Sequence, residues 1–146
     1  MRIYFDNCSL QRPLDDQAQP RIEWETGAVI AILAACETGD ATLVSSEVLL
    51  AEIAGTFDLE RRETTLGILG IAQETIVVGE EIEERAQELE NFGIGTMDAL
   101  HLASAEAGRA EYFCTCDDKL LKRARAINGL ETKAVSPIEL FEEIRK

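Results

Sequence analysis

Short β-rich runs alternate with longer stretches of helical periodicity along the whole 146-residue chain. Such alternation is typical of βα units, in which each strand is followed by a helix that packs on the sheet. We expect strands at residues 2–5, 42–45, 74–78, 112–115 and 132–135, and helices at about 21–38, 46–55, 58–71, 80–91, 96–107, 117–127 and 137–144. The pattern predicts one α/β domain over residues 1–146, a three-layer α/β/α sandwich around a mainly parallel sheet of about 4–5 strands.

Residues that start or stop helices support these boundaries. Ser46, Asp58 and Thr96 stand where helix N-caps are expected, because short polar side chains accept hydrogen bonds from the first free backbone N–H groups. Gly39 stands where the first long helix should end. Residues 11–20 are polar and contain two prolines, so we expect a loop there.

The N-terminus does not resemble a signal peptide, because only Ile3-Tyr4-Phe5 precede the first acid, whereas a signal peptide needs an apolar region of roughly 7–15 residues. No run of about 18 apolar residues occurs either. We therefore expect a cytoplasmic protein that does not enter a membrane and whose cysteines are free thiols. A Cys-x-Cys pair with a single histidine disfavours a structural zinc site.

Acidic residues stand at the expected ends of two strands. Asp6 directly follows the first strand, and Asp117 lies just past the strand at 112–115. In open α/β sheets, ligands bind beyond the carboxyl ends of the strands, near the point where the strand order reverses. Taken singly, Asp117 is better explained as the cap of the next helix and Asp6 as the start of a turn.

Two further acids stand in helical segments that are otherwise apolar. At helical spacing Glu52 shares a side with Val48, and Asp98 shares a side with His101. A carboxylate on a buried face is costly unless it is paired or holds a metal, and few basic residues are near. A solvated helix edge remains an alternative for Glu52, and a helix N-terminus for Asp98. Four acids at one edge of the sheet nevertheless predict a cation site.

The formal net charge of −14 argues against broad, tight and non-specific binding of nucleic acid. It does not exclude a site where metal ions supply the positive charge. Several basic residues could contact phosphates or simply form solvated helix faces: Arg12, Arg21, Lys119, Lys122, Arg123 and Arg125.

Four blocks, in this order, resemble the PIN-domain family, whose best-known small members are the VapC-type toxins of toxin–antitoxin pairs. The blocks are Ile3-Tyr4-Phe5-Asp6-Asn7, Ser46-Glu47-Val48-Leu49-Leu50-Ala51-Glu52-Ile53, Met97-Asp98-Ala99-Leu100-His101-Leu102-Ala103-Ser104-Ala105 and Phe113-Cys114-Thr115-Cys116-Asp117-Asp118-Lys119-Leu120-Leu121. Each block alone is weak, but their order and spacing over most of the chain make the resemblance fairly specific.

The resemblance implies a PIN-like fold and an endoribonuclease that uses Mg²⁺ or Mn²⁺ to hydrolyse phosphodiester bonds in single-stranded RNA. It places the family's four catalytic acids at Asp6, Glu52, Asp98 and Asp117. Asp6, Asp98 and Asp117 are the expected metal ligands, and Asn7 and Thr115 are the expected supporting residues. His101 could face this site as a proton donor or phosphate contact, although a satisfied, partly buried histidine is the commoner use of such a residue.

Two acids compete with these assignments. Glu47 stands beside Ser46, which suggests a first-turn position, and Asp118 follows Asp117, which the Thr-x-Asp pattern favours. The chain also departs from the family pattern at residues 8–20, where a longer polar loop is expected in place of an early helix.

Two other functions remain open at this stage. A catalytically idle PIN fold could serve as a binding or regulatory protein, and metal dependence would separate it from the enzyme. A haloacid-dehalogenase-like phosphatase also begins with a strand ending in Asp, but its second Asp would fall at Cys8, so the general acid is missing. Besides RNA, an antitoxin protein or a second copy of the chain are the partners considered, and toxin versus RNA-processing enzyme is left open.

Overall fold

The computed structural model describes residues 1–146 and contains one five-stranded sheet of order β3-β2-β1-β4-β5. All four strand pairings are parallel, which confirms the prediction of an α/β/α arrangement around a parallel sheet. The strands are β1 (Arg2–Phe5), β2 (Thr42–Ser46), β3 (Glu74–Ile76), β4 (Tyr112–Cys114) and β5 (Lys133–Val135).

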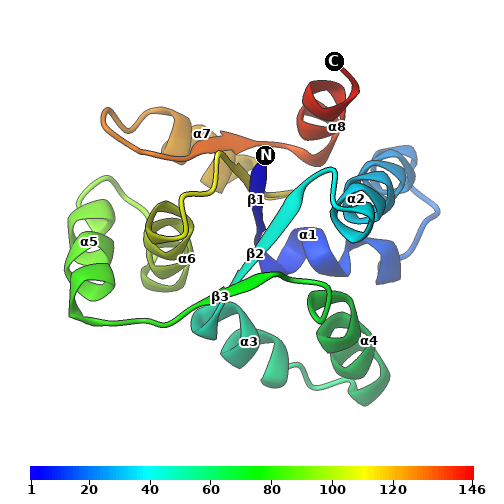
Figure 1. Cartoon of the computed structure of the whole chain (residues 1–146), viewed down its shortest axis with the longest axis horizontal. Coiled ribbons are helices and arrows are strands. Elements are labelled where there is room, and N and C mark those ends of the chain that lie inside the picture. Colours follow the sequence, from blue (N-terminus) through cyan, green and yellow to red (C-terminus); the bar gives the residue numbers. More distant parts are fainter.

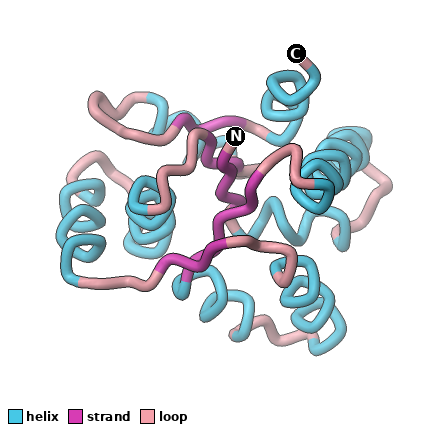
Figure 2. Tube along the Cα trace, viewed as in Figure 1, coloured by secondary structure: helices cyan, strands magenta, loops and turns pink.

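Helices cover both faces of this sheet. α5 and α6 lie on one side of the strands, and α2 and α8 pack together on the other (Figure 1). The tube in Figure 2 shows the strands running through the middle of the molecule between these helices. The helices are α1 (Asn7–Gln11), the 3₁₀ turn η1 (Arg12–Leu14), α2 (Pro20–Thr38), α3 (Glu47–Ala54), α4 (Leu59–Leu69), α5 (Glu80–Glu90), α6 (Thr96–Ala107), α7 (Asp118–Arg125) and α8 (Pro137–Arg145).

The central strand explains why both faces need a cover. Ile3, Tyr4 and Phe5 are completely buried, so β1 has no solvated face, as expected for a strand inside a parallel sheet. The Tyr4 ring stacks on Phe113 of the neighbouring strand, with ring centroids 5.7 Å apart, and these two residues are register partners. This stacked pair helps to fix how β1 lies against β4.

The first part of residues 11–20 was wrongly predicted as loop. The Asp6 carboxylate accepts a hydrogen bond from the Ser9 N–H, which starts α1 directly after β1, and η1 continues the chain with Pro13 in its first turn. An early helix therefore does follow the first strand, contrary to the departure expected from the sequence. The stretch lacks apolar periodicity because α1 and η1 are too short to show one.

The expected N-cap at Thr96 was also wrong. Gly95 has extended backbone angles (φ −66°, ψ 157°) and occupies the N-cap position, and Thr96 is the first residue of α6. The Thr96 hydroxyl instead donates a 2.5 Å hydrogen bond to Glu90 at the end of α5. Ser46 and Asp58 do cap α3 and α4 as predicted, and Gly39 ends α2 with a left-handed backbone (φ 87°).

The strand order indicates which edge of the sheet would bind a ligand. The chain runs from β1 outward to β2 and β3, and then returns to β4 on the opposite side of β1. Because all strands are parallel, their carboxyl ends share an edge, and the crevice between β1 and β4 opens where the winding direction reverses. No helix combines the length and apolar character needed to span a membrane.

Candidate active site

All four acids predicted from the sequence line one cavity of about 360 Å³ at this edge, together with Asn7. Asp6 comes from the end of β1 and Asp117 from the end of the segment that follows β4. Glu52 comes from α3, the helix after β2, and Asp98 from the first turn of α6. Residues separated by more than a hundred positions thus meet at the switch point between β1 and β4.

Asp6 and Asp117 hold their positions by capping helices. Oδ1 of Asp6 accepts the Ser9 N–H at 3.0 Å. Oδ1 of Asp117 accepts the backbone N–H groups of Lys119 and Leu120 at 3.0 and 3.1 Å, which starts α7. The capping role considered for Asp117 is therefore real, and Asp6 caps a helix where the sequence suggested a turn. Each carboxylate still has a second oxygen, and the one on Asp6 receives the weak Cys8 thiol at 3.1 Å.

Asp6 is the most deeply buried acid of the cavity, with 5% of its surface exposed. Burial raises its pKa, and hydrogen bonds from Thr115, Cys8 and Ser9 partly offset this because they favour the charged form. The Thr115 hydroxyl also accepts the Asp117 N–H at 3.0 Å. Thr115 itself does not border the cavity, so it contacts two of the acids from behind.

Asp98 is half-buried and feels the other acids directly. Its pKa is raised first by burial and then by the negative charge of Asp6, with smaller contributions from Asp117 and Glu52; only His101 lowers it. No hydrogen bond is among these causes. The Asp98 carboxylate is thus an ionisable group crowded by like charges, as expected where carboxylates gather to hold a cation.

Glu52 is about one-third exposed and is held by the single histidine of the chain. His101 Nε2 lies 3.1 Å from Glu52 Oε1, and its Nδ1 lies 2.7 Å from the Tyr4 hydroxyl. The Tyr4 hydroxyl in turn lies 2.6 Å from the Ser46 hydroxyl. His101 is only 1% exposed, so it is a satisfied, buried histidine that nevertheless contacts the site.

The two competing acids face elsewhere. Glu47 accepts the N–H of Val78, two residues past the end of β3, at 2.9 Å. Asp118 is exposed and forms hydrogen bonds of 2.7 and 2.8 Å with Arg21. Neither borders the cavity.

Three polar residues of the cavity were not predicted from the sequence: Gln11, Asp15 and Arg61. Arg61 reaches from α4 to the Leu14 carbonyl at 3.1 Å and forms an ion pair with Asp15. It is the only arginine or lysine that lines the cavity, and none of the arginines and lysines singled out from the sequence does so. Arg12 pairs with Asp15 and the buried Glu25 instead.

The donor set suits a hard divalent cation. Five carboxylates line the cavity, from Asp6, Asp15, Glu52, Asp98 and Asp117, against one guanidinium. Mg²⁺ and Mn²⁺ prefer such oxygen ligands. No three acidic, cysteine or histidine side chains converge into a ready ligand set, so Asp6, Asp98 and Asp117 border the space without enclosing one point. Mg²⁺ commonly takes one or two carboxylates and keeps several waters, which this open arrangement allows.

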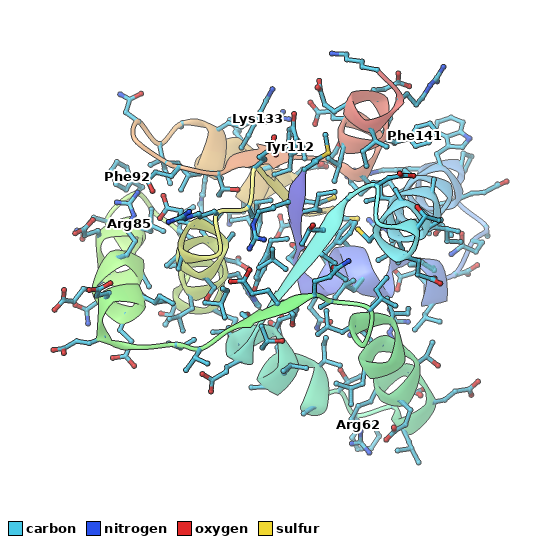
Figure 3. The ribbon with its side chains drawn as sticks, viewed as in Figure 1. Arg62, Arg85, Phe92, Tyr112, Lys133 and Phe141 are labelled. Atoms are coloured by element: carbon cyan, nitrogen blue, oxygen red, sulfur yellow. The ribbon has the colours of Figure 1, made fainter.

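A larger hollow of about 890 Å³ lies beside β5 but lacks this concentration of charge. Its acids alternate with Arg125 and Lys133, and Arg125 is bonded to Glu139. Tyr112 and Lys133, labelled in Figure 3, mark this side of the molecule. The smaller cavity is therefore the better candidate for chemistry on a phosphate.

All four cysteines, Cys8, Cys36, Cys114 and Cys116, are free thiols as predicted.

Solved structures with the same fold cover nearly the whole chain. FitAcB from Neisseria gonorrhoeae matches with a TM-score of 0.62 at 16% identity, over 93% of this chain and 98% of that chain. VapBC2 from Rickettsia felis, bound to a DNA fragment from its promoter, gives 0.61 at 18% over 93% and 98%. VapBC-1 from nontypeable Haemophilus influenzae gives 0.58 at 16% over 94% and 99%. At such low identity these likenesses establish the fold.

None of the curated protein sequences compared with the chain matches it. The family model of the PIN domain does match, over residues 25–127, which is more than half of the chain. The matched range contains Glu52, Asp98 and Asp117, and Asp6 precedes it. The match also displaces the dehalogenase-like alternative. By its sequence and its fold, the chain belongs to the PIN-domain family.

Proposed function

We propose that this protein is an endoribonuclease that hydrolyses phosphodiester bonds in single-stranded RNA and depends on Mg²⁺ or Mn²⁺. PIN domains are generally nucleases, which supports the reaction class. The observation that carries the proposal is the meeting of Asp6, Glu52, Asp98 and Asp117 in one cavity at the switch point of the sheet. The larger hollow beside β5 has only three acids in its lining, and these share it with two basic side chains, Arg125 and Lys133.

Each residue has a role that follows from its surroundings. Asp6, Asp98 and Asp117 would hold the cation, which supplies Lewis-acid stabilisation of the phosphate and an activated water when bound. Glu52 would orient the attacking water or complete the ligand set. Asn7 borders the cavity, and Thr115 supports Asp6 and Asp117 through its hydroxyl. The rigid caps on Asp6 and Asp117 keep the carboxylates in place without the cation.

Single-stranded RNA should be cut with Mg²⁺ or Mn²⁺ and should stay intact when EDTA removes the cation. The reason is electrostatic: a phosphodiester cannot approach five carboxylates unless a cation first neutralises them. The measurement is cleavage of a labelled single strand by purified protein, with activity following the protein peak through a final sizing column. Equal cutting in EDTA would point to a contaminant. No cutting under any metal condition would favour a catalytically idle PIN fold.

Arg61 should contribute to substrate binding, because it is the only cation lining the cavity. We expect Arg61→Ala to raise the KM for RNA about tenfold, the loss of one charged hydrogen bond. The salt dependence of binding should also fall by about one phosphate contact.

The matched control for Arg61 is its neighbour Arg62, which projects outward from α4 (Figure 3) and lies 4.0 Å from Glu63 rather than at the cavity. Arg62→Ala should leave both KM and salt dependence unchanged. Equal effects of the two substitutions would mean that only the overall charge of α4 matters.

We further propose that the chain is the toxin of a toxin–antitoxin pair and that an antitoxin protein is its partner. The support is the fold shared with FitAcB, VapBC2 and VapBC-1 over 93–94% of the chain. A homodimer is a further proposed assembly. These proposals are independent of the cation test above.

A further inference from the structure

Four hydrogen-bonding groups form an unbroken chain behind the cavity: Ser46, Tyr4, His101 and Glu52. Consecutive polar atoms lie 2.6, 2.7 and 3.1 Å apart. The first three residues are completely or almost completely buried, and only Glu52 reaches solvent. Since water does not reach the inner groups, each of them must find its hydrogen-bond partner among these four side chains or the nearby backbone.

The donor and acceptor of each hydrogen bond in this network follow from the contacts of Ser46, at its buried end. The Ser46 oxygen already accepts the Leu49 N–H at 3.0 Å, and its only other partner is the Tyr4 hydroxyl. The Ser46 hydrogen therefore has an acceptor only if it points to Tyr4. The Tyr4 hydrogen then points to Nδ1 of His101, which leaves the ring proton on Nε2, where it is donated to Glu52. Every hydrogen in this arrangement is satisfied.

This hydrogen-bond network also connects the elements that carry the acids. Tyr4 stands in β1, two residues before Asp6, and Ser46 caps α3, the helix that carries Glu52. His101 stands in α6, one turn beyond Asp98. A shift of α3 or α6 along the sheet would break one of the buried hydrogen bonds, so the network resists such movement.

We propose that His101, held in its Nε2–H tautomer by Tyr4 and Ser46, is a positioning residue that fixes the Glu52 carboxylate at the cavity. A ring nitrogen that donates to a functional carboxylate sets the orientation of that carboxylate, as hydrogen-bonded partners behind catalytic groups do. The proposal rests on the proposed function only where activity is measured, because the tautomer is a property of the resting protein.

The tautomer can be read without any RNA or metal. His101 is the only histidine, so a long-range ¹H–¹⁵N spectrum contains one imidazole ring and needs no assignment. We expect one protonated nitrogen, identified as Nε2 by its correlations to both carbon-bound ring protons, and one pyridine-like nitrogen. Tyr4→Phe keeps the stacked ring but removes the donor to Nδ1, so the preference should weaken. A wild-type ring protonated on Nδ1, or on both nitrogens, would overturn the proposal.

The positioning role is tested by two replacements of similar polarity. Glutamine carries its amide nitrogen about where Nε2 lies, and asparagine about where Nδ1 lies. We expect His101→Gln to cleave RNA nearly as fast as wild type. His101→Asn should lose about 10–100-fold in kcat with little change in KM. A merely structural histidine predicts losses that follow stability and not the position of the amide, so equal kcat values for equally folded variants would contradict the proposal.

A double-mutant cycle shows whether His101 acts through Glu52. If it does, His101→Asn should have almost no effect on single-turnover cleavage in a Glu52→Gln background, because the group that it positions is already altered. Additive losses would assign His101 an independent role and overturn the proposal. A wild-type protein that cuts no RNA would refute the proposed function alone, since the imidazole spectrum still decides the tautomer.

Discussion

Asp98→Asn should reduce RNA cleavage by about a thousandfold or more while the protein stays folded, and Asp6→Asn should do the same. A metal-assisted site supplies several kcal/mol of transition-state stabilisation, and each 1.36 kcal/mol is a factor of ten in rate. Asparagine keeps the shape of aspartate but removes the charge that would hold the cation. Asparagine also remains a good helix N-cap, so α1 should still be capped at position 6.

The matched control is Asp118→Asn, which makes the same chemical change next to the site. Asp118 directly follows Asp117, yet it is exposed, pairs with Arg21 and does not line the cavity. Its loss should leave the cleavage rate unchanged. Circular dichroism and thermal unfolding establish that all three variants are folded. Wild-type rates in folded Asp6 and Asp98 variants would place the reaction elsewhere.

The second large effect concerns stability, where Mn²⁺ should protect the wild type and not Asp98→Asn. At about 100 times its dissociation constant, a ligand that binds only the folded protein stabilises it by about 2.7 kcal/mol. Asp98→Asn should lose most of this gain, because it weakens the carboxylate group that attracts the cation. Thermal unfolding with and without Mn²⁺ measures the difference, and Asp118→Asn should respond like the wild type. A full Mn²⁺ shift in Asp98→Asn would contradict the assignment of Asp98 to the cation site.

Without Mn²⁺ the order of stability should reverse, so that Asp98→Asn is the more stable protein. Burial and the charge of Asp6 raise the Asp98 pKa, so its ionised form is destabilised in the folded protein. Because the folded pKa is raised, the favourable contribution of protonated Asp98 is present in acid and is lost as pH rises through that pKa. The variant's advantage should therefore grow from acidic to neutral pH. Allowing for solvent screening, it should reach on the order of 1 kcal/mol, or about 3 °C.

The sequence predicted that four acids would lie at one edge of the sheet, because the fold makes their positions simple to derive. Asp6 and Asp117 follow strands of a parallel sheet, whose carboxyl ends must share an edge. Glu52 and Asp98 were detectable because an acid in an apolar helix needs a partner or an ion. In the structure Glu52 has such a partner, because it lies within hydrogen-bond distance of His101. The helical spacing alone did not predict this contact.

The rest of the site depends on contacts between segments far apart in the chain. Arg61 lines the cavity only because α4 packs on α1, which brings its guanidinium to the segment around Leu14 and Asp15. Nothing local to Arg61 distinguishes it from Arg62. The early helix α1 was missed for a different reason, since it depends on a single cap at Asp6, which the sequence suggested only as the start of a turn.

The use of one side chain both to cap a helix and to carry charge at the cavity restricts which amino acids can stand at positions 6 and 117, after β1 and β4. At positions 6 and 117 the residue must begin a helix with one oxygen and present negative charge with the other. Glutamate keeps the charge but is too long for the cap, whereas asparagine and serine keep the cap without the charge. Among the twenty amino acids only aspartate meets both demands, so every substitution at these two positions loses the helix cap, the negative charge or both.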